Sequence, residues 1–249
     1  MPIVWGVPRQ PRLGDHVKLG IIGAMEVEVA LLKEALEDVR VVKAGSHEVW
    51  CGRLRGLEVA VVRSGVGKVF AAMCTQALID VCAPDAIVNT GIAGSLDPSI
   101  DIGDFVVATD CIQHDYDVTA AGYFDLGIVP GMPSIGIDTD ESLRAKLVAA
   151  ARRAVPEAGI FEGRIASGDQ FVADDARKSF IRERFSALCC EMESAPIAQV
   201  SWANGVPFGI VRAISDKADS TSVEEYPANE EDIALRCARV ILELAPMLT

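Results

Sequence analysis

The chain has 249 residues, half of them apolar and about a quarter charged, which suffices for one substantial core but not for two ordinary domains. Its net charge of −13 would repel nucleic acid phosphates, and no basic cluster with interleaved aromatic residues counters it, so polynucleotide binding is excluded. No apolar run reaches the roughly 18 residues of a membrane span, and no basic-then-apolar leader is recognisable. We predict a soluble, cytoplasmic protein without membrane contact.

Residues 1–17 carry three prolines and no repeating period, so they are predicted to be an irregular N-terminal extension. From Lys18 onward, continuous apolar runs of strand length alternate with helical segments, which indicates strands buried on both faces of a sheet between helices. The glycine-punctuated stretch 39–57 is typical of a strand meander and makes the sheet mixed. The predicted strands cover 19–23, 58–65, 85–94, 104–110 and 207–215, and the predicted helices 25–38, 67–82, 140–154, 174–185, 195–204 and 229–247.

The seven cysteines are scattered and mostly stand among apolar residues. They are therefore predicted to be small core residues in a reducing compartment. Cys189 and Cys190 are neighbours, but no second pair stands at ligand spacing, which favours packing over zinc binding.

The first helical segment, MEVEVALLKEALED, carries acidic residues on more than one face. At about 100° per residue, Glu26 groups with Lys33, whereas Glu28 points about 200° away, toward the side of Leu31. A buried carboxylate without a partner is costly, so an inward Glu28 after a strand end indicates a functional residue. Capping of its own helix is an equally good interpretation, because the helix dipole favours negative charge at that end.

A second group of carboxylates stands in CEMES, where Glu191 and Glu193 flank a methionine between an apolar stretch and a helix start. In an extended segment both would point to one side; the alternative is first-turn capping, although two acids exceed what one helix start requires. Arg212, inside an apolar strand, needs an acidic partner, and Glu191 or Glu193 would serve. Asp216 ends that strand where ligands of α/β sheets usually bind, or it caps the following turn.

Other motifs carry little chemistry. SGVGK (64–68) is too short for a phosphate-binding loop, and NTGIAGSL (89–96) lacks the dinucleotide fingerprint. Of the three histidines, only His114 stands among other polar candidates, so carboxylates are the favoured acids and bases. The sequence predicts neither a metal nor a cofactor.

Seven ordered segments resemble the successive signatures of bacterial methylthioadenosine/S-adenosylhomocysteine nucleosidases of the nucleoside phosphorylase superfamily. The resemblance covers 18–249 and implies one nucleosidase domain: an α/β, three-layer αβα fold around a mixed, partly barrel-like sheet. It also implies hydrolysis of the N-glycosidic bond of both nucleosides, releasing adenine and the 5-thioribose product. The segments are LGIIGAMEVEV, VVRSGVGKVFAA, IVNTGIAGSL, HDYDVTAAGY, SGDQFV, CEMESAPIA and VRAISD.

Carried over by position, the resemblance implies that Glu28 activates the attacking water and that Asp216, oriented by Ser215, protonates adenine N7. Glu193 would hydrogen-bond the ribose hydroxyls, and Met192 would pack against the sugar. Because such cleavage leaves positive charge on the sugar, a carboxylate near the ribose would stabilise the transition state. An ionised Glu28 would repel phosphate, which favours hydrolysis over phosphorolysis.

The resemblance also implies the rest of the pocket. The aromatic ring of residue 171 and the backbone of residue 172 would hold the adenine, and residues 25, 93 and 94 would lie near the water and the sugar. The segment 114–133 would reach into the neighbouring subunit's site, so a homodimer is implied. The additional substrate-binding residues are Met25, Ala93, Gly94, Phe171, Val172 and Glu191.

Three positions depart from the commonest family pattern. Ile92 replaces a serine near the water, Ala121 replaces a frequent phenylalanine that closes the alkylthio pocket, and Tyr226 or a neighbour replaces the aromatic lid residue. These changes leave the choice of 5'-substituent open. An aminodeoxyfutalosine nucleosidase of menaquinone synthesis is therefore one alternative, and a nucleoside-binding protein without catalysis is another, although a pure binder would not need both Glu28 and Asp216.

Overall fold

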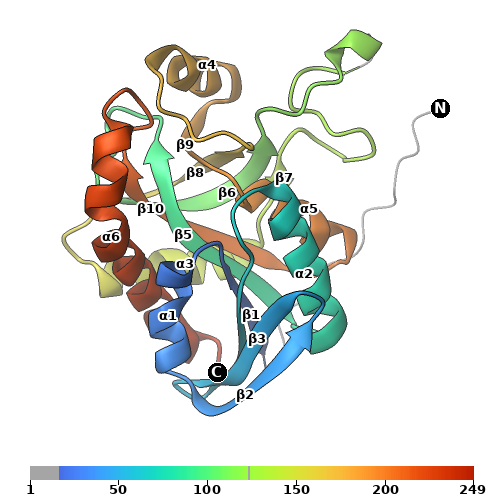
Figure 1. Cartoon of the computed structure of the whole chain (residues 1–249), viewed down its shortest axis with the longest axis vertical. Coiled ribbons are helices and arrows are strands. Elements are labelled where there is room, and N and C mark those ends of the chain that lie inside the picture. Colours follow the sequence, from blue (N-terminus) through green and yellow to red (C-terminus); the bar gives the residue numbers. More distant parts are fainter. Residues whose placement is uncertain (1–16, 123) are drawn as a thin grey trace.

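The computed structural model describes residues 17–122 and 124–249, which are organised by one mixed β-sheet (Figure 1). Its strands are β1 (Lys18–Gly23), β2 (Glu37–Ala44), β3 (His47–Leu54), β4 (Leu57–Arg63), β5 (Ala86–Ser95), β6 (Phe105–Gln113), β7 (Ile137–Asp138), β8 (Ile160–Ser167), β9 (Ala187–Glu191) and β10 (Phe208–Asp216). Strands β5, β9, β8, β6 and β10 form a closed ring, because β10 pairs with both β6 and β5. Strands β1, β4, β3 and β2 extend the sheet from β5, and β7 pairs with β6.

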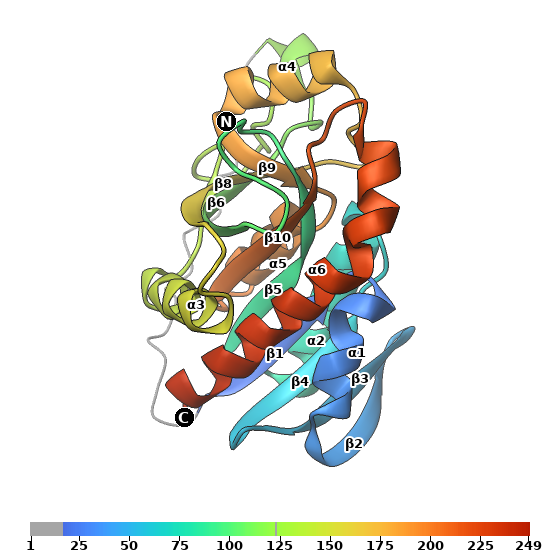
Figure 2. The same ribbon diagram turned by 90° about the vertical axis from the view of Figure 1, so that its left-hand side faces the viewer.

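Helices cover both faces of this sheet. They are α1 (Glu26–Glu34), α2 (Lys68–Cys82), α3 (Glu141–Ala154), α4 (Asp175–Phe185), α5 (Ser194–Ala203) and α6 (Ser222–Leu244), with short 3₁₀ turns η1 (Thr119–Ala121) and η2 (Ala245–Met247). Helices α1 and α3 pack against α6 on one face, and α2 packs against α5 on the other. Figure 2 shows the long α6 running past the strands with α1 beside it. The predicted three-layer αβα fold with a mixed, partly barrel-like sheet is confirmed.

The strands predicted from continuous apolar runs are present and largely buried, apart from the exposed Glu58 and Arg63 of β4. Every residue of β5 and of β10 is buried. Strand β5 pairs in parallel with both β1 and β10, so the carboxyl ends of these three strands meet at one edge of the sheet. In α/β folds this is the edge at which ligands bind.

Several elements differ from the sequence prediction, and the short strands β7 and β9 are absent from it. The helix predicted over 25–38 is too long: it ends at Glu34, and β2 begins at Glu37. Strand β8 is absent from the prediction because only its last three residues are fully buried, so its sequence shows no continuous apolar run. The helix predicted to begin at 229 begins at Ser222 and contains Pro227. A proline early in a helix removes one hydrogen bond, a loss that this helix of 23 residues accommodates.

All seven cysteines are buried and free, as predicted for core residues. No helix within the described ranges is long and apolar enough to cross a membrane. Of the predicted extension 1–17, Val17 is buried against the core, and the other positions lie outside the described residues.

Candidate active site

A cavity of about 300 Å³ lies where the carboxyl ends of β1, β5 and β10 meet. It is lined by Ala24, Met25, Glu28, Val66, Ile92, Ala93, Gly94, Gln170, Phe171, Val172, Cys190, Glu191, Met192, Glu193, Ser215, Asp216 and Tyr226. Every site residue predicted from the sequence belongs to this lining. The fold thus brings into one cavity residues that are scattered along the chain, and their chemical roles stay predictions.

Four residues of the lining were not predicted from the sequence to belong to the site. Ala24, Val66, Gln170 and Cys190 line the cavity, and each stands within one of the seven segments that carry the family resemblance. Residues of this kind carry no charge, so composition alone does not mark them. Only their position within these segments could have indicated that they belong to the site.

Glu28 is buried, and backbone amides hold its carboxylate at the start of α1. Oε2 accepts hydrogen bonds from the amides of Ala24 (2.6 Å) and Met25 (2.9 Å), and Oε1 accepts one from the amide of Ile92 (3.1 Å). The carboxylate caps its helix, as one interpretation of the sequence predicted, and it also lines the cavity, while its functional role stays a prediction. Burial raises the pKa of Glu28, against the lowering effects of Arg212 and these amides. A raised pKa makes a carboxylate a stronger base.

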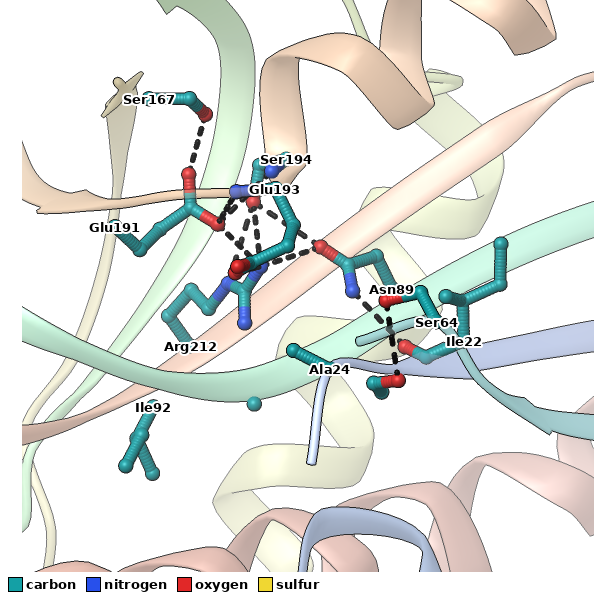
Figure 3. A network of polar contacts seen from close by, with 12 residues as sticks. Ile22, Ala24, Ser64, Asn89, Ile92, Ser167, Glu191, Glu193, Ser194 and Arg212 are labelled. Atoms are coloured by element: carbon teal, nitrogen blue, oxygen red, sulfur yellow. Dashed lines mark hydrogen bonds and ion pairs between the residues drawn. The ribbon is translucent and has the colours of Figure 1, made fainter. Parts of the chain in front are cut away.

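Arg212 is the fully buried centre of a polar network (Figure 3). Its Nη2 donates to Asn89 Oδ1 (2.6 Å), to Ser194 Oγ (3.0 Å) and to the carboxylate of Glu191, and it lies 3.7 Å from Glu193 Oε2. The acidic partner predicted for Arg212 is therefore present, and both carboxylates supply it. These acceptors compensate the buried charge of the guanidinium and fix its position.

The close approach of Arg212 and Glu28 depends on Gly91 of β5. A β-carbon at this position would overlap both Nη1 of Arg212 and Oε1 of Glu28. The carbonyl of Gly91 accepts a hydrogen bond from the Cys237 thiol of α6 (3.1 Å). Any side chain at position 91 would push the cation and the carboxylate apart.

Glu191 and Glu193 have different surroundings although both face Arg212. Oε2 of Glu191 accepts from the amides of Glu193 (3.0 Å) and Ser194 (2.8 Å) as well as from Arg212, and its Oε1 accepts from the Ser167 hydroxyl. Both oxygens of Glu191 therefore bind protein groups: Oε2 binds amides at the start of α5 and Arg212 of β10, and Oε1 binds the last residue of β8. This arrangement favours a positioning role for Glu191, and the ligand contact predicted for it stays a prediction.

Glu193 retains acceptor capacity toward the cavity. Its Oε1 accepts from the amide of Gly67 (2.8 Å) at the start of α2, and Oε2 has only the longer contact with Arg212. Burial and the negative charge of Glu191 raise the pKa of Glu193 to about 7, against the lowering effects of Arg212 and the Gly67 amide. Small pH changes near neutrality therefore change the charge of this side chain.

Asp216 ends β10 with its carboxyl group almost fully buried. Its Oδ2 accepts from the Ser215 hydroxyl (2.9 Å) and its Oδ1 from the amide of Ala218 (2.9 Å). A β-carbon on Gly94 would lie 2.8 Å from Oδ1, so glycine makes room for the carboxyl group. Two hydrogen bonds therefore fix the orientation of this carboxyl group at the cavity wall.

Aromatic side chains form the open side of the cavity. The rings of Phe171 and Tyr226 meet edge to face, with centroids 5.6 Å apart. The Tyr226 hydroxyl contacts Met25 Sδ (3.3 Å) and Glu230 Oε1 (3.0 Å). Phe171 remains half exposed, so a planar ligand could cover it. Tyr226, one of the predicted lid candidates, lines the cavity. Ile92, which departs from the commonest family pattern, also lines it.

His114 lies outside the cavity lining. It is 1% exposed, and neither ring nitrogen has a hydrogen-bond partner among the described residues. Burial lowers the pKa of His114, which keeps the ring neutral. The preference for carboxylates over histidine as acids and bases stays a prediction.

The closed barrel, the helices on both faces and the cavity at the strand ends define a nucleoside phosphorylase-like protein. The sequence model of the phosphorylase superfamily matches residues 18–246. A methylthioadenosine/S-adenosylhomocysteine nucleosidase from Neisseria meningitidis, solved with methylthio-immucillin-A, is 37% identical, with a TM-score of 0.87 over 91% of this chain and 97% of that chain.

Two further structures are similar over nearly their whole length. An S-adenosylhomocysteine nucleosidase from Streptococcus pyogenes, in complex with 5-methylthiotubericidin, is 35% identical, with a TM-score of 0.89 and coverage of 96% of this chain and 100% of that one. A futalosine hydrolase of Helicobacter pylori is 34% identical, with a TM-score of 0.87 and coverage of 93% and 98%. The chain belongs to the phosphorylase superfamily.

Proposed function

We propose that this protein is a nucleosidase that hydrolyses the N-glycosidic bond of 5'-methylthioadenosine and S-adenosylhomocysteine. The main support for this proposal is that Glu28, Glu193 and Asp216 line one cavity. Asp216 protonates N7 of adenine, Glu28 takes a proton from the attacking water, and Glu193 binds the ribose hydroxyls. Phe171 covers the adenine, the backbone of Val172 binds it, and Met192 packs on the sugar.

The charges of the cavity favour water over phosphate as the nucleophile. A phosphorylase must hold a phosphate dianion with cations and amides, but the described residues that line this cavity include no lysine or arginine. Arg212 stands behind the lining and is already bound to Glu191 and Asn89. Phosphate at the position of the water would also meet the carboxylate of Glu28, and like charges repel.

The decisive experiment measures adenine release by the pure protein from methylthioadenosine, S-adenosylhomocysteine and aminodeoxyfutalosine, each with and without phosphate. We expect release from the first two at rates that phosphate does not change. Activity that requires phosphate would replace hydrolysis by phosphorolysis. Absence of release from all three would favour the alternative of a nucleoside-binding protein without catalysis.

An aminodeoxyfutalosine nucleosidase is the second candidate. Two observations favour it: the 34% identity to a futalosine hydrolase, and Ile92, which presents an apolar side chain to the cavity where the nucleosidase pattern has a hydroxyl. Release from aminodeoxyfutalosine alone would establish this candidate instead. Both candidates use the same three carboxylates, so the assay separates substrate choice from mechanism.

Substrate capture should depend on pH through Glu193. An acid whose pKa is raised to about 7 is protonated below that pH and ionised above it. The ionised form accepts hydrogen bonds from the ribose hydroxyls, so kcat/KM should fall about tenfold per pH unit below pH 7 and level off above it. Rates measured from pH 5 to 9 check this. Glu193→Gln should lose the inflection; its persistence would assign the titration to another group such as Glu28.

We further propose a homodimer built on the exposed face of α2. Val66, Val69, Phe70 and Met73 each have half or more of their surface exposed, and their spacing places them on one face of the helix and the turn before it. Val66 also lines the cavity, so a subunit docked on this face would adjoin the site. The segment that follows β6 begins beside α2, where Asp115 pairs with Lys68 (2.7 Å). Its described residues, 114–122 and 124–133, extend away from the sheet (Figure 1).

Phe70→Asp should convert the dimer into a monomer, because it places a charge in an apolar contact. Sedimentation or light scattering gives the mass, and adenine release should fall in the same variant if the partner's segment 114–133 completes the site. Val39→Asp, on an equally exposed valine of β2, is the control and should leave the dimer intact. A wild-type protein that sediments as a monomer would remove the dimer from the proposal.

A further inference from the structure

Two buried thiols lie close to each other, one in the strand meander and the other at the end of α2. Cys51 lies in β3, and Cys82 is the last residue of α2. Their sulfur atoms are 3.9 Å apart. A disulfide requires about 2.05 Å between sulfurs, so the two sulfurs must approach each other by about 2 Å to form the bond.

Both cysteines border solvent-accessible space. Cys51 lines a cavity of about 230 Å³ and Cys82 lines one of about 670 Å³, and the two cavities share Lys18, Arg53 and Glu58. Solvent in these cavities therefore adjoins both residues, which are themselves 3% and 5% exposed. Arg40 stands opposite Cys51 in the strand register, and the ammonium of Lys18 donates to the carbonyl of Cys82 (2.6 Å).

We propose that Cys51 and Cys82 are a site of reversible oxidation, which a hydroperoxide converts into a disulfide. One thiolate attacks the peroxide, the O–O bond breaks, and a sulfenic acid and hydroxide result. The second thiolate attacks the sulfenic sulfur, the S–S bond forms, and the S–O bond breaks to release hydroxide. The two thiols lose two electrons and two protons, and hydrogen peroxide is reduced to two waters.

The cations beside the pair influence how fast this reaction proceeds. Burial and the neighbouring Cys51 raise the pKa of Cys82 to about 11, while Lys18 and Arg40 act to lower it. The thiolate is the reactive form and is scarce at neutral pH, so oxidation should accelerate about tenfold per pH unit between pH 7 and 9. We therefore expect that prolonged exposure to peroxide oxidises the two thiols and that brief exposure does not.

The cross-link would join two elements that are 31 positions apart in the chain. Closing such a loop restricts the unfolded chain, and we expect the unfolding temperature to rise by about 5–10 °C. The link sits at the opposite end of α2 from Gly67, whose amide binds Glu193. The oxidised protein should therefore gain stability without rearrangement of the cavity.

The test treats the reduced full chain with hydrogen peroxide, then denatures and alkylates it. We expect two fewer alkylated cysteines than in the reduced protein, one peptide joining Cys51 to Cys82, and reversal of both changes by dithiothreitol. These readouts are independent of the proposed enzymatic activity. A peptide map that shows a bond between Cys189 and Cys190, or oxidised but unlinked thiols, would overturn the proposal. An alkylated protein with the same mass before and after peroxide treatment would also overturn it.

Single substitutions provide the matched comparison. Cys51→Ser and Cys82→Ser should each lose the link and the rise in unfolding temperature. Cys74→Ser changes another buried cysteine of α2 and should keep both. A Cys74→Ser protein that fails to cross-link would contradict the assignment, and the peptide map of the wild-type chain decides the matter if a variant does not fold.

Discussion

Asp216→Asn should reduce the rate of adenine release by about 10²–10⁴-fold, the usual contribution of a positioned general acid. An amide cannot deliver the proton that adenine needs as it leaves, and without that proton the leaving group carries a full negative charge. The measurement is kcat with methylthioadenosine under saturating substrate. Substrate binding, measured by calorimetry, should remain, because the ring and ribose contacts proposed above are unchanged.

The fold should survive this substitution because its two hydrogen bonds can be kept. The oxygen of the new side-chain amide can accept from the Ala218 amide, while its amino group donates to the Ser215 hydroxyl, which is able to accept as well as donate. An unfolding temperature close to that of the wild type checks this. Asp101→Asn, an exposed carboxylate that pairs with Lys217 outside the cavity, is the control and should leave the rate unchanged. Near-normal turnover by Asp216→Asn would remove this residue from the mechanism.

Local patterns marked the carboxylates of the site as candidates, because burial of a charged residue is visible in the pattern of its neighbours, and the family resemblance supplied the other site residues and all the roles. A helix has a fixed period, so the inward direction of Glu28 follows from the spacing of its neighbours. An arginine inside an apolar strand must be compensated, so an acidic partner for Arg212 could be expected. The continuous apolar runs of β5 and β10 predicted strands buried on both faces, and the edge where they end holds the cavity.

Other parts of the site depend on contacts that no local pattern records. The amide of Gly67 binds a carboxylate 126 positions away, and only the packing of α2 against α5 brings the two together. From the sequence, Glu191 and Glu193 were predicted to point to the same side of an extended segment. In the structure the chain turns at Met192, so the two carboxylates have different partners. Strand β8 was missed for a similar reason: its neighbours in the barrel, β6 and β9, stabilise a segment with a weak apolar pattern.

Glu28→Gln should lower adenine release by a comparable factor of about 10²–10⁴, because a neutral amide cannot take the proton of the attacking water. Stability should also change, in contrast to Asp216→Asn. All three hydrogen-bond partners of the Glu28 carboxylate are backbone donors, so the amino group of the substituted side chain must face at least one N–H. An unsatisfied buried donor costs about 1–3 kcal/mol, and the unfolding temperature should fall accordingly.

A loss of rate could then reflect a distorted cavity rather than a missing base, and two further variants separate these causes. Glu26→Gln changes an exposed carboxylate on the same helix, paired with Lys33, and should leave the rate unchanged. Glu28→Ala opens space at the cavity wall, and added formate can occupy it and accept the proton of water. Partial recovery with formate would identify a missing base, because a small carboxylate cannot repair a misfolded cavity. Absence of recovery, together with near-normal rates in Glu28→Gln, would assign activation of the water to a different group.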